Sequence, residues 1–171
     1  KEITVTGAYV ELVTDLEIEA MRVVGNGDGA WLNGISWDPA ADENIMTEIT
    51  NKVYSITFED VDEFENYQVK FAANGSWADN WGGVYAGSGV EGDAVYNSND
   101  NITFDVPYEV ADVTITLDLT NFNYTAKTGA KYTVTVKDAT EVPTEPTTAP
   151  ATEEPTTAPT TEPTTEAPTV P

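Results

Sequence analysis

Alternating apolar and polar residues along the chain predict a series of short β-strands. The clearest run covers residues 52–59, where Tyr54, Ile56 and Phe58 share one side of the chain. The opposite side is mostly polar, as a half-buried strand requires. Further strands are predicted at residues 3–9, 21–24, 67–73, 102–106, 112–119 and 131–136.

Glycine, asparagine and aspartate separate these runs, and only residues 40–49 suggest a helix, of one or two turns. Seven or eight short strands with glycine-rich connections and little helix predict an all-β fold, namely a β-sandwich. The longest irregular stretch, residues 74–101, contains two of the four tryptophans. Long loops on a rigid sheet often carry binding residues, so this stretch is the first place to expect a site.

Residues 138–171 differ in composition from everything before them. This segment contains no Phe, Leu, Ile, Tyr or Trp and consists almost entirely of Thr, Pro, Glu and Ala. It cannot bury enough apolar surface to offset the conformational entropy lost on folding, so a disordered linker is predicted. The predicted organisation is a β-sandwich domain over residues 1–137 and a linker over residues 138–171, with further modules expected in the same polypeptide.

The composition excludes several kinds of chemistry. The chain has no Cys and no His, which removes disulfides, thiol nucleophiles, imidazole metal ligands and histidine bases. The formal net charge of −23 disfavours nucleic acid and anionic membranes as partners and leaves uncharged partners such as neutral polysaccharide. The simpler alternative is that this charge only solvates the surface of a secreted protein. No apolar run approaches the ~20 residues of a membrane span, so membrane insertion is not expected.

The four tryptophans are the first candidates for binding residues. Trp31, Trp37, Trp77 and Trp81 lie among Gly, Asn, Ser and Asp residues rather than in apolar runs. A flat indole can stack on the apolar C–H face of a sugar ring while polar neighbours bond the sugar hydroxyls. The alternative is that each tryptophan is a core residue, and we expect one or two of the four to be exposed.

Lys70 and two tyrosines are further candidates. Alternation places Lys70 on the outer face of its strand, opposite the apolar residues on either side of it. Its ammonium can donate hydrogen bonds to sugar hydroxyls, although an ordinary solvated lysine is the simpler interpretation. Tyr85 and Tyr96 lie in the long loop and are weaker candidates for stacking.

Carboxylates and calcium give weaker signals. A glycosidase needs two acids roughly 5–10 Å apart, and with 30 Asp and Glu residues a chance pair is close to certain. The domain is also small for a hydrolase, so no catalytic residue is assigned and a non-enzyme is predicted. Residues 26–28 and 93–100 offer oxygen ligands for a structural calcium ion, but neither follows the spacing of a calcium-binding loop. No cofactor is required by the sequence.

Residues 67–82 carry a resemblance to a known family. The Lys70-Phe71 strand, the Asn-Gly-Ser-Trp turn that ends at Trp77 and the following Trp81-Gly82 resemble the starch-binding modules of bacterial pullulanases, gut starch-utilisation binding proteins and amylosome cell-surface proteins. Other pieces follow in the family's order, at residues 21–25, 37–39, 45–46, 53–54 and 113–118. The resemblance covers roughly residues 21–136 and implies an immunoglobulin-like β-sandwich. Residues 1–20 and the loop 82–101 have no counterpart in it.

The resemblance also implies a function. The principal site of the related modules is two tryptophans and a lysine, which correspond here to Trp37, Lys70 and Trp77. The expected ligand-binding set adds a third tryptophan and two neighbours, Trp81, Asn80 and Tyr85. The implied module is a non-catalytic, monomeric binder of starch and maltooligosaccharides in a secreted, extracellular or bacterial cell-surface protein. Two alternatives stay open, a structural or adhesive sandwich and a module for another glycan such as xylan or mucin.

Overall fold

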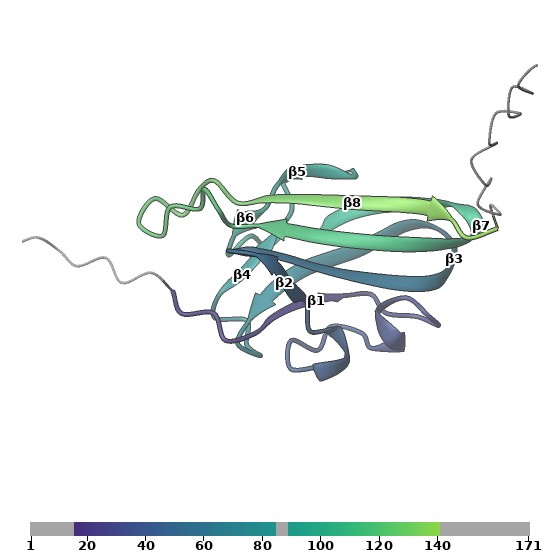
Figure 1. Ribbon diagram of the computed structural model, residues 1–171, viewed down its shortest axis with the longest axis horizontal. Helices are drawn as coiled ribbons and strands as arrows, with labels where there is room; N and C mark the ends of the chain where they lie inside the picture. The colour runs from purple at the N-terminus through teal and green to yellow at the C-terminus, as the bar shows by residue number, and fades with distance from the viewer. Residues whose placement is uncertain (1–15, 85–88, 141–171) are drawn as a thin grey trace, which may run out of the picture. The chain divides into compact units, whose positions relative to one another are not determined.

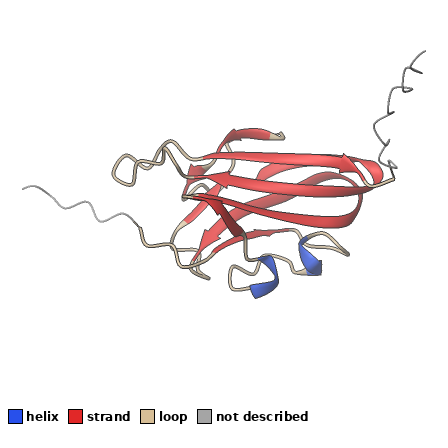
Figure 2. Cartoon of the chain, viewed as in Figure 1, coloured by secondary structure: helices blue, strands red, loops and turns tan. Residues whose placement is uncertain are grey.

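The computed structural model describes residues 16–84 and 89–140, which form eight strands and two short 3₁₀ helices (Figures 1 and 2). The 3₁₀ helices are Leu32–Gly34 and Asp42–Asn44. The strands are β1 (Met21–Gly25), β2 (Thr47–Thr50), β3 (Val53–Ala73), β4 (Asn80–Gly82), β5 (Glu91–Asp93), β6 (Val95–Tyr96), β7 (Ile102–Asp118) and β8 (Lys131–Asp138). The predicted all-β sandwich is confirmed. The strand predicted at residues 3–9 and residues 141–171 of the predicted linker lie outside the described residues.

Two long strands, β3 and β7, organise the sheet. They pair antiparallel, from Val53 opposite Asp118 to Val69 opposite Ile102. On the far side of β7 the sheet continues through β8 to β5, and on the far side of β3 it continues through β4 to β6. The short strands β2 and β1 pair with the beginning and the end of β3, respectively.

β3 and β7 bend together near their middles, at the right of Figure 1. The register of the pair shifts three times between Phe58 and Tyr67. Asp60 and Asn66, within this stretch, have φ angles of 55° and 66°, and such irregularities bend a strand and increase its twist. Because of the bend, the two halves of β3 belong to different layers of the sandwich.

The structure corrects three sequence predictions. The runs at residues 52–59 and 67–73 are two halves of β3, and those at 102–106 and 112–119 are two halves of β7. Bulges interrupt the alternation of apolar and polar residues without interrupting the strand. The sequence therefore predicts two short strands where the backbone forms one long strand. The helix predicted at residues 40–49 is wrong, because only Asp42–Asn44 are helical and β2 begins at Thr47.

No helix among the described residues is long and apolar enough to cross a membrane.

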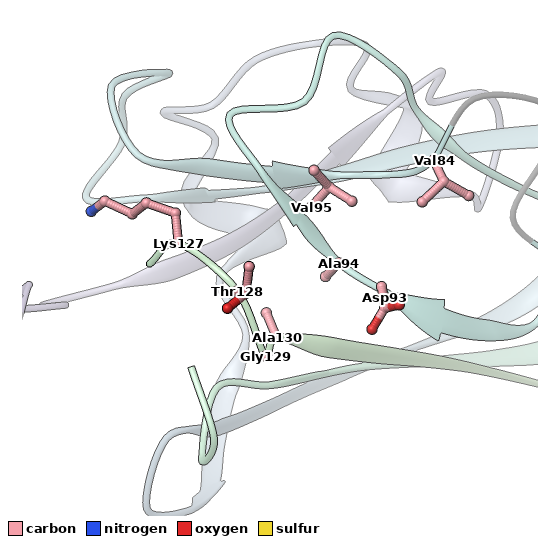
Figure 3. Close-up of a pocket in the computed structure, with 8 residues that line it drawn as sticks. All are labelled: Val84, Asp93, Ala94, Val95, Lys127, Thr128, Gly129 and Ala130. Atoms are coloured by element: carbon pink, nitrogen blue, oxygen red, sulfur yellow. The ribbon is translucent and has the colours of Figure 1, made fainter. Parts of the chain in front are cut away.

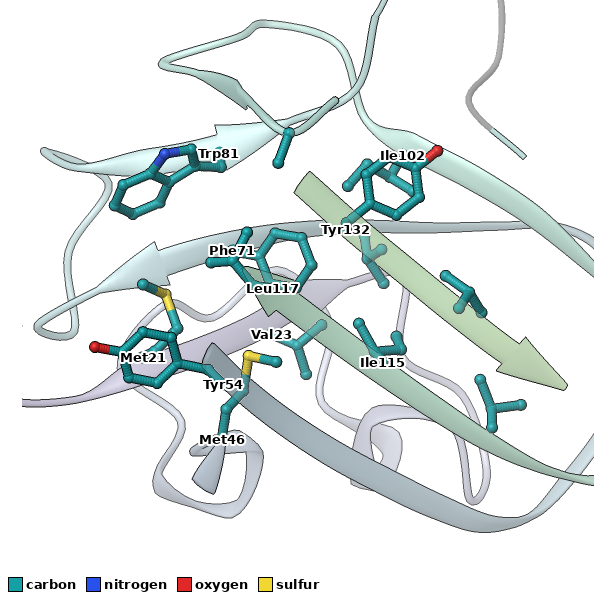
Figure 4. Close-up of a cluster of buried hydrophobic side chains, with 14 of the residues drawn as sticks. Met21, Val23, Met46, Tyr54, Phe71, Trp81, Ile102, Ile115, Leu117 and Tyr132 are labelled. Carbon is teal, nitrogen blue, oxygen red and sulfur yellow. The ribbon is translucent and has the colours of Figure 1, made fainter. Parts of the chain in front are cut away.

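Aromatic rings join the two layers. Trp31 is fully buried, and its ring centroid lies 5.2 Å from that of Phe58, 4.9 Å from Tyr67 and 5.4 Å from Phe104. Phe58 and Tyr67 come from the two halves of β3, so this one indole contacts both layers in the edge-on and tilted geometries that aromatic rings prefer. Figure 4 shows another part of the core, where side chains from several strands converge, including Met21, Val23, Phe71, Trp81, Ile102, Ile115, Leu117 and Tyr132.

Candidate functional site

The outer face of three paired strands carries Lys70. β3 pairs with β1 on one side and β4 on the other, so Lys70 lies opposite Val24 and beside Gly82. Its sequence neighbours Val69 and Phe71 are fully buried, and successive side chains of a strand point to opposite faces. Lys70 therefore points outward, as the alternation in the sequence predicts.

The Lys70 ammonium is held in place on this face. It donates a hydrogen bond to the carbonyl oxygen of Ser98, and its Nζ lies 5.9 Å from the ring centroid of Trp77, at the outer limit of a cation–π contact. Burial lowers the pKa of Lys70 from its ordinary value, and the charge of Asp100 partly opposes this shift. An ammonium has three N–H donors, so the bond to Ser98 leaves donors for another partner.

Trp77 lies in the turn that follows β3, with 39% of its surface exposed. The turn begins with Asn74 and Gly75, whose φ angles of 55° and 69° lie in the left-handed region that Asn and Gly tolerate best. The Asn74 amide fastens the turn to the preceding chain, because its oxygen accepts from the Glu19 N–H at 2.8 Å and its nitrogen donates to the Glu17 carbonyl at 2.9 Å. The Asn-Gly-Ser-Trp sequence thus builds a turn that presents an indole to solvent.

Trp37 is 37% exposed and lies in the connection after β1. Its backbone N–H donates to the Gly25 carbonyl at 2.8 Å, and its φ of 56° turns the chain away from that strand.

Arg22, buried on the outer face of β1, holds the loop that follows Trp37. Its guanidinium donates to the Ala41 carbonyl at 3.1 Å and forms an ion pair with Asp42 at 2.6 Å.

The loops that carry the two exposed tryptophans lie side by side. A methyl group placed on Gly75, in the Trp77 turn, would lie 3.8 Å from Cα of Ala40 and 3.9 Å from the Pro39 carbonyl oxygen. Pro39 and Ala40 come directly after Trp37-Asp38 in sequence. The segment that directly follows Trp37 therefore adjoins the turn that carries Trp77, whose ring lies near the Lys70 ammonium.

Trp81 is a core residue, and its predicted contact with ligand is wrong. It lies on β4 opposite the buried Phe71 and is itself 0% exposed. Its ring forms T-shaped contacts with Tyr96 and Phe122, at centroid distances of 5.5 and 5.6 Å. β4 has only three residues, too few for its alternation to be recognised in the sequence. With Trp31 also buried, two of the four tryptophans are exposed, within the expected one or two.

Asn80 has an internal role rather than the predicted direct contact with ligand. The residue is only 8% exposed, and its amide nitrogen donates to the Trp77 carbonyl at 2.9 Å and to Oδ1 of Asn97 at 3.0 Å. A buried side chain whose donors are used within the protein cannot bond a surface sugar, so this prediction is corrected. Tyr85, the remaining predicted contact, lies outside the described residues.

Two of the oxygen ligands suggested for calcium are engaged elsewhere. Oδ1 of Asn26 accepts from the Gln68 N–H at 2.7 Å, and Asp93 forms an ion pair with Lys131 at 2.6 Å. Within residues 16–84 and 89–140, no group of three or more acidic side chains is placed to hold a metal ion. The described part of the chain thus gives no support for a structural calcium site.

The pocket in Figure 3 is a separate feature. It has a volume of about 250 Å³ and is lined by residues after β4, where β5 meets β6, and before β8, namely Val84, Asp93, Ala94, Val95, Lys127, Thr128, Gly129 and Ala130. Neither exposed tryptophan lines it, and neither does Lys70. Small-molecule sites are usually concave, whereas an open face lets a long polymer pass across it.

Tyr96, at the edge of the sandwich, has a strongly perturbed phenol. Its hydroxyl donates to the Asp79 carboxylate, and Nζ of Lys127 lies 4.3 Å from its ring centroid. Burial, followed by the hydrogen bond and the charge of Asp79, raises the pKa of Tyr96 from 10.0 to about 12.

This shift predicts that the domain loses stability between about pH 10 and 12. In that window the unfolded phenol is ionised while the folded one keeps its proton. The contribution of Tyr96 to the free energy of unfolding is therefore complete below pH 10 and lost as the pH rises through about 12. Thermal unfolding midpoints, measured across this range, should fall less steeply for Tyr96→Phe than for the unsubstituted domain. Equal slopes would show that Tyr96 is not the source of the alkaline sensitivity.

Comparison with known proteins covers all eight strands of the domain. The model of the pullulanase X25 domain family matches residues 20–143, well over half of the chain. Among solved structures, pullulanase from Bacillus acidopullulyticus is 18% identical, with 69% of this chain and 14% of that chain covered, and its TM-score of 0.38 is too low to carry an argument. No curated protein matches the chain. The family match, which includes both exposed tryptophans and Lys70, shows that the chain belongs to the pullulanase X25 domain family.

Proposed function

We propose that this domain is a non-catalytic module that binds α-glucan, as starch or maltooligosaccharides, on the face formed by Trp37, Lys70 and Trp77, called here the glucan face. One observation carries the proposal. Two exposed tryptophans lie on adjoining loops, beside a half-buried lysine whose ammonium is already hydrogen-bonded to the protein. The family match to an accessory domain of pullulanase supports a binding role rather than a catalytic one.

The chemistry of the glucan face suits an α-glucan. A glucose ring presents axial C–H bonds that stack on an indole and hydroxyls that accept hydrogen bonds from an ammonium. The twist of an α-1,4 chain favours two aromatic planes set at an angle, whereas flat cellulose favours a coplanar row. The family is named for pullulanase, whose name denotes an enzyme of pullulan, itself an α-glucan.

The module would act as one part of a larger extracellular or cell-surface protein. The composition of residues 138–171 suits a spacer between modules. A single face of this size is expected to bind weakly, on the order of micromolar to millimolar, because the stacked area is small and hydroxyl desolvation offsets part of the gain. Neighbouring modules would then raise retention through effective concentration.

Titration with maltoheptaose tests the proposal. Stacking on the exposed indoles should shift or quench the intrinsic tryptophan fluorescence, against a constant background from the buried Trp31 and Trp81. The domain should also be retained on insoluble starch. No change in fluorescence together with no retention would refute the proposal. Stronger retardation in native gels that contain xylan or mucin than in gels that contain starch would assign the face to another glycan.

The alternatives make different predictions. A purely structural or adhesive sandwich is expected to bury all four tryptophans, and two are exposed here, which favours the binding role. A small hydrolase would release reducing ends from starch on prolonged incubation, and we expect none.

Lys70→Ala should weaken maltoheptaose binding by ~1–2 kcal/mol, because charge-assisted hydrogen bonds to sugar hydroxyls are lost. Isothermal titration calorimetry measures the change. Lys131→Ala is the matched control, since it removes an exposed lysine whose ammonium is paired with Asp93. An equal loss of affinity in both variants would indicate a general effect of charge rather than a contact made by Lys70.

A further inference from the structure

We propose that the turn of residues 97–100, called here the brace, positions both the lysine and one tryptophan of the glucan face before ligand arrives. The turn joins β6 to β7 and lies against the end of β4. This inference rests on the proposed function and deepens it. It assigns positioning roles to Asn80, Asn97 and Ser98, which act on the ligand only through Lys70 and Trp77.

One arm of the brace holds the lysine. The Ser98 carbonyl accepts the hydrogen bond from the Lys70 ammonium. The Ser98 hydroxyl donates to the Gly83 carbonyl at 2.8 Å and accepts from the Asp100 N–H at 3.0 Å, and the Gly83 N–H donates to the Asp100 carbonyl at 2.9 Å. The turn that holds the ammonium is therefore tied to the end of β4 by two hydrogen bonds to Gly83 and is braced internally by a third.

Gly82 lets the brace approach the lysine this closely. A methyl group placed on Gly82 would collide with the Asp100 carbonyl oxygen and would lie 3.0 Å from Cε of Lys70 and 3.3 Å from Cβ of Ser98. No larger residue fits there without moving backbone. The lysine stem and the brace thus both pack against this one glycine.

The other arm reaches Trp77. The Asn97 N–H donates to the Asn80 carbonyl at 2.7 Å, and Oδ1 of Asn97 accepts from the Asn80 amide nitrogen, which also donates to the Trp77 carbonyl. Oδ1 of Asn80 is buried and has no hydrogen-bond partner among the described residues. An unpaired buried acceptor is costly, so the orientation of this amide is set by its two donors, one toward the brace and one toward Trp77.

Such a brace would raise affinity without adding a contact to the ligand. A lysine side chain has many rotamers, and fixing them only when ligand binds would cost conformational entropy at that moment. Because Lys70 is already bonded to Ser98, its side chain loses this conformational entropy when the domain folds and not when ligand binds. Removal of the brace should therefore weaken binding even though Lys70 and Trp77 are intact.

A double-mutant cycle tests the lysine arm. Ser98→Ala removes two of the bonds that fix the Ser98 carbonyl and should weaken maltoheptaose binding about fivefold, the worth of roughly one hydrogen bond. In a Lys70→Ala background the same substitution should change nothing, because the group it positions is absent. A loss of equal size in both backgrounds would overturn the lysine arm, since a general structural effect does not depend on Lys70.

A rescue experiment tests the tryptophan arm. Asn97 has a φ of 50°, and its side-chain oxygen accepts hydrogen bonds from Asn80, while the same side chain also forms a hydrogen bond with Tyr96. Asn97→Gly keeps the backbone conformation and removes the acceptor, so binding should weaken about fivefold. Asn97→Asp keeps the acceptor and should bind like the unsubstituted domain. Asn66→Gly is the control, because it changes a residue of the same type with a φ of 66° in the distant bend of β3.

The outcomes separate this inference from the proposed function. If the unsubstituted domain binds no α-glucan, both fail. If it binds and Asn97→Gly binds equally well, or Asn97→Asp fails to restore affinity, the tryptophan arm fails alone. Unfolding midpoints of all variants, measured beside the affinities, ensure that each loss of binding is scored on folded protein.

Discussion

Replacing Trp77 with alanine should abolish most retention on insoluble starch and leave the domain folded. The side chain is 39% exposed and lies in a turn outside the core, so its truncation removes a stacking surface and opens no internal cavity. Loss of a central aromatic contact typically costs ~2 kcal/mol or more of binding energy. The free energy of unfolding should change by less than about 1 kcal/mol, as for other substitutions away from the core.

Starch pull-down and urea unfolding of the same preparation measure both effects. Trp77→Phe serves as the graded control, because it keeps a smaller ring in the same turn and should retain part of the binding. If Trp77→Ala unfolds the domain, the indole is a structural element and the glucan face is misassigned. If starch retention persists in the folded variant, stacking on Trp77 plays no part in binding.

Trp81→Ala should have the opposite effect, lowering the free energy of unfolding by ~3–5 kcal/mol, as expected when a fully buried indole is removed. The side chain is 0% exposed and packs edge-on against Tyr96 and Phe122. Small domains are stable by only ~5–15 kcal/mol, so this single change would remove a large share of the total. The midpoint of urea unfolding should fall accordingly.

Trp81→Phe provides the intermediate case, because a smaller ring leaves a smaller cavity at the same position. Starch binding by the fraction of Trp81→Ala that remains folded should match that of the unsubstituted domain. If Trp81→Ala kept normal stability and no longer bound starch, Trp81 would be a ligand contact and not a core residue. Trp77 and Trp81 are four residues apart, so the two alanine variants together separate contact from core within one short segment.

Local patterns in the sequence predict a good part of the glucan face. The outward direction of Lys70 follows from the alternation of a strand whose flanking residues are apolar. The turn before Trp77 follows from an Asn-Gly pair, because those two residues favour positive φ angles, which the structure shows at 55° and 69°. Each of these inferences depends on only a few neighbouring residues.

Features that depend on distant partners could not be predicted in this way. β3 and β7 appear in the sequence as four short strands, because the bulges that let them bend also break the alternation. The burial of Trp81 depends on pairing with Phe71, and the role of Asn80 depends on Asn97, seventeen residues later. A polar residue close to a tryptophan in sequence resembles a ligand contact, unless it is known that its hydrogen-bonding groups are already bonded to other residues of the protein.

The pairing of β7 with β8 has a mechanical consequence. Asp138, at the end of β8, lies opposite Ala111 near the bend. Trp77 follows the C-terminal end of β3, which lies away from the bend (Figure 1). Tension between a glucan held at Trp77 and the chain that leaves β8 would therefore run along the strands. Interstrand hydrogen bonds lie perpendicular to that direction, so the load would fall on all eight residue pairs of β7 and β8 at once instead of opening them one by one.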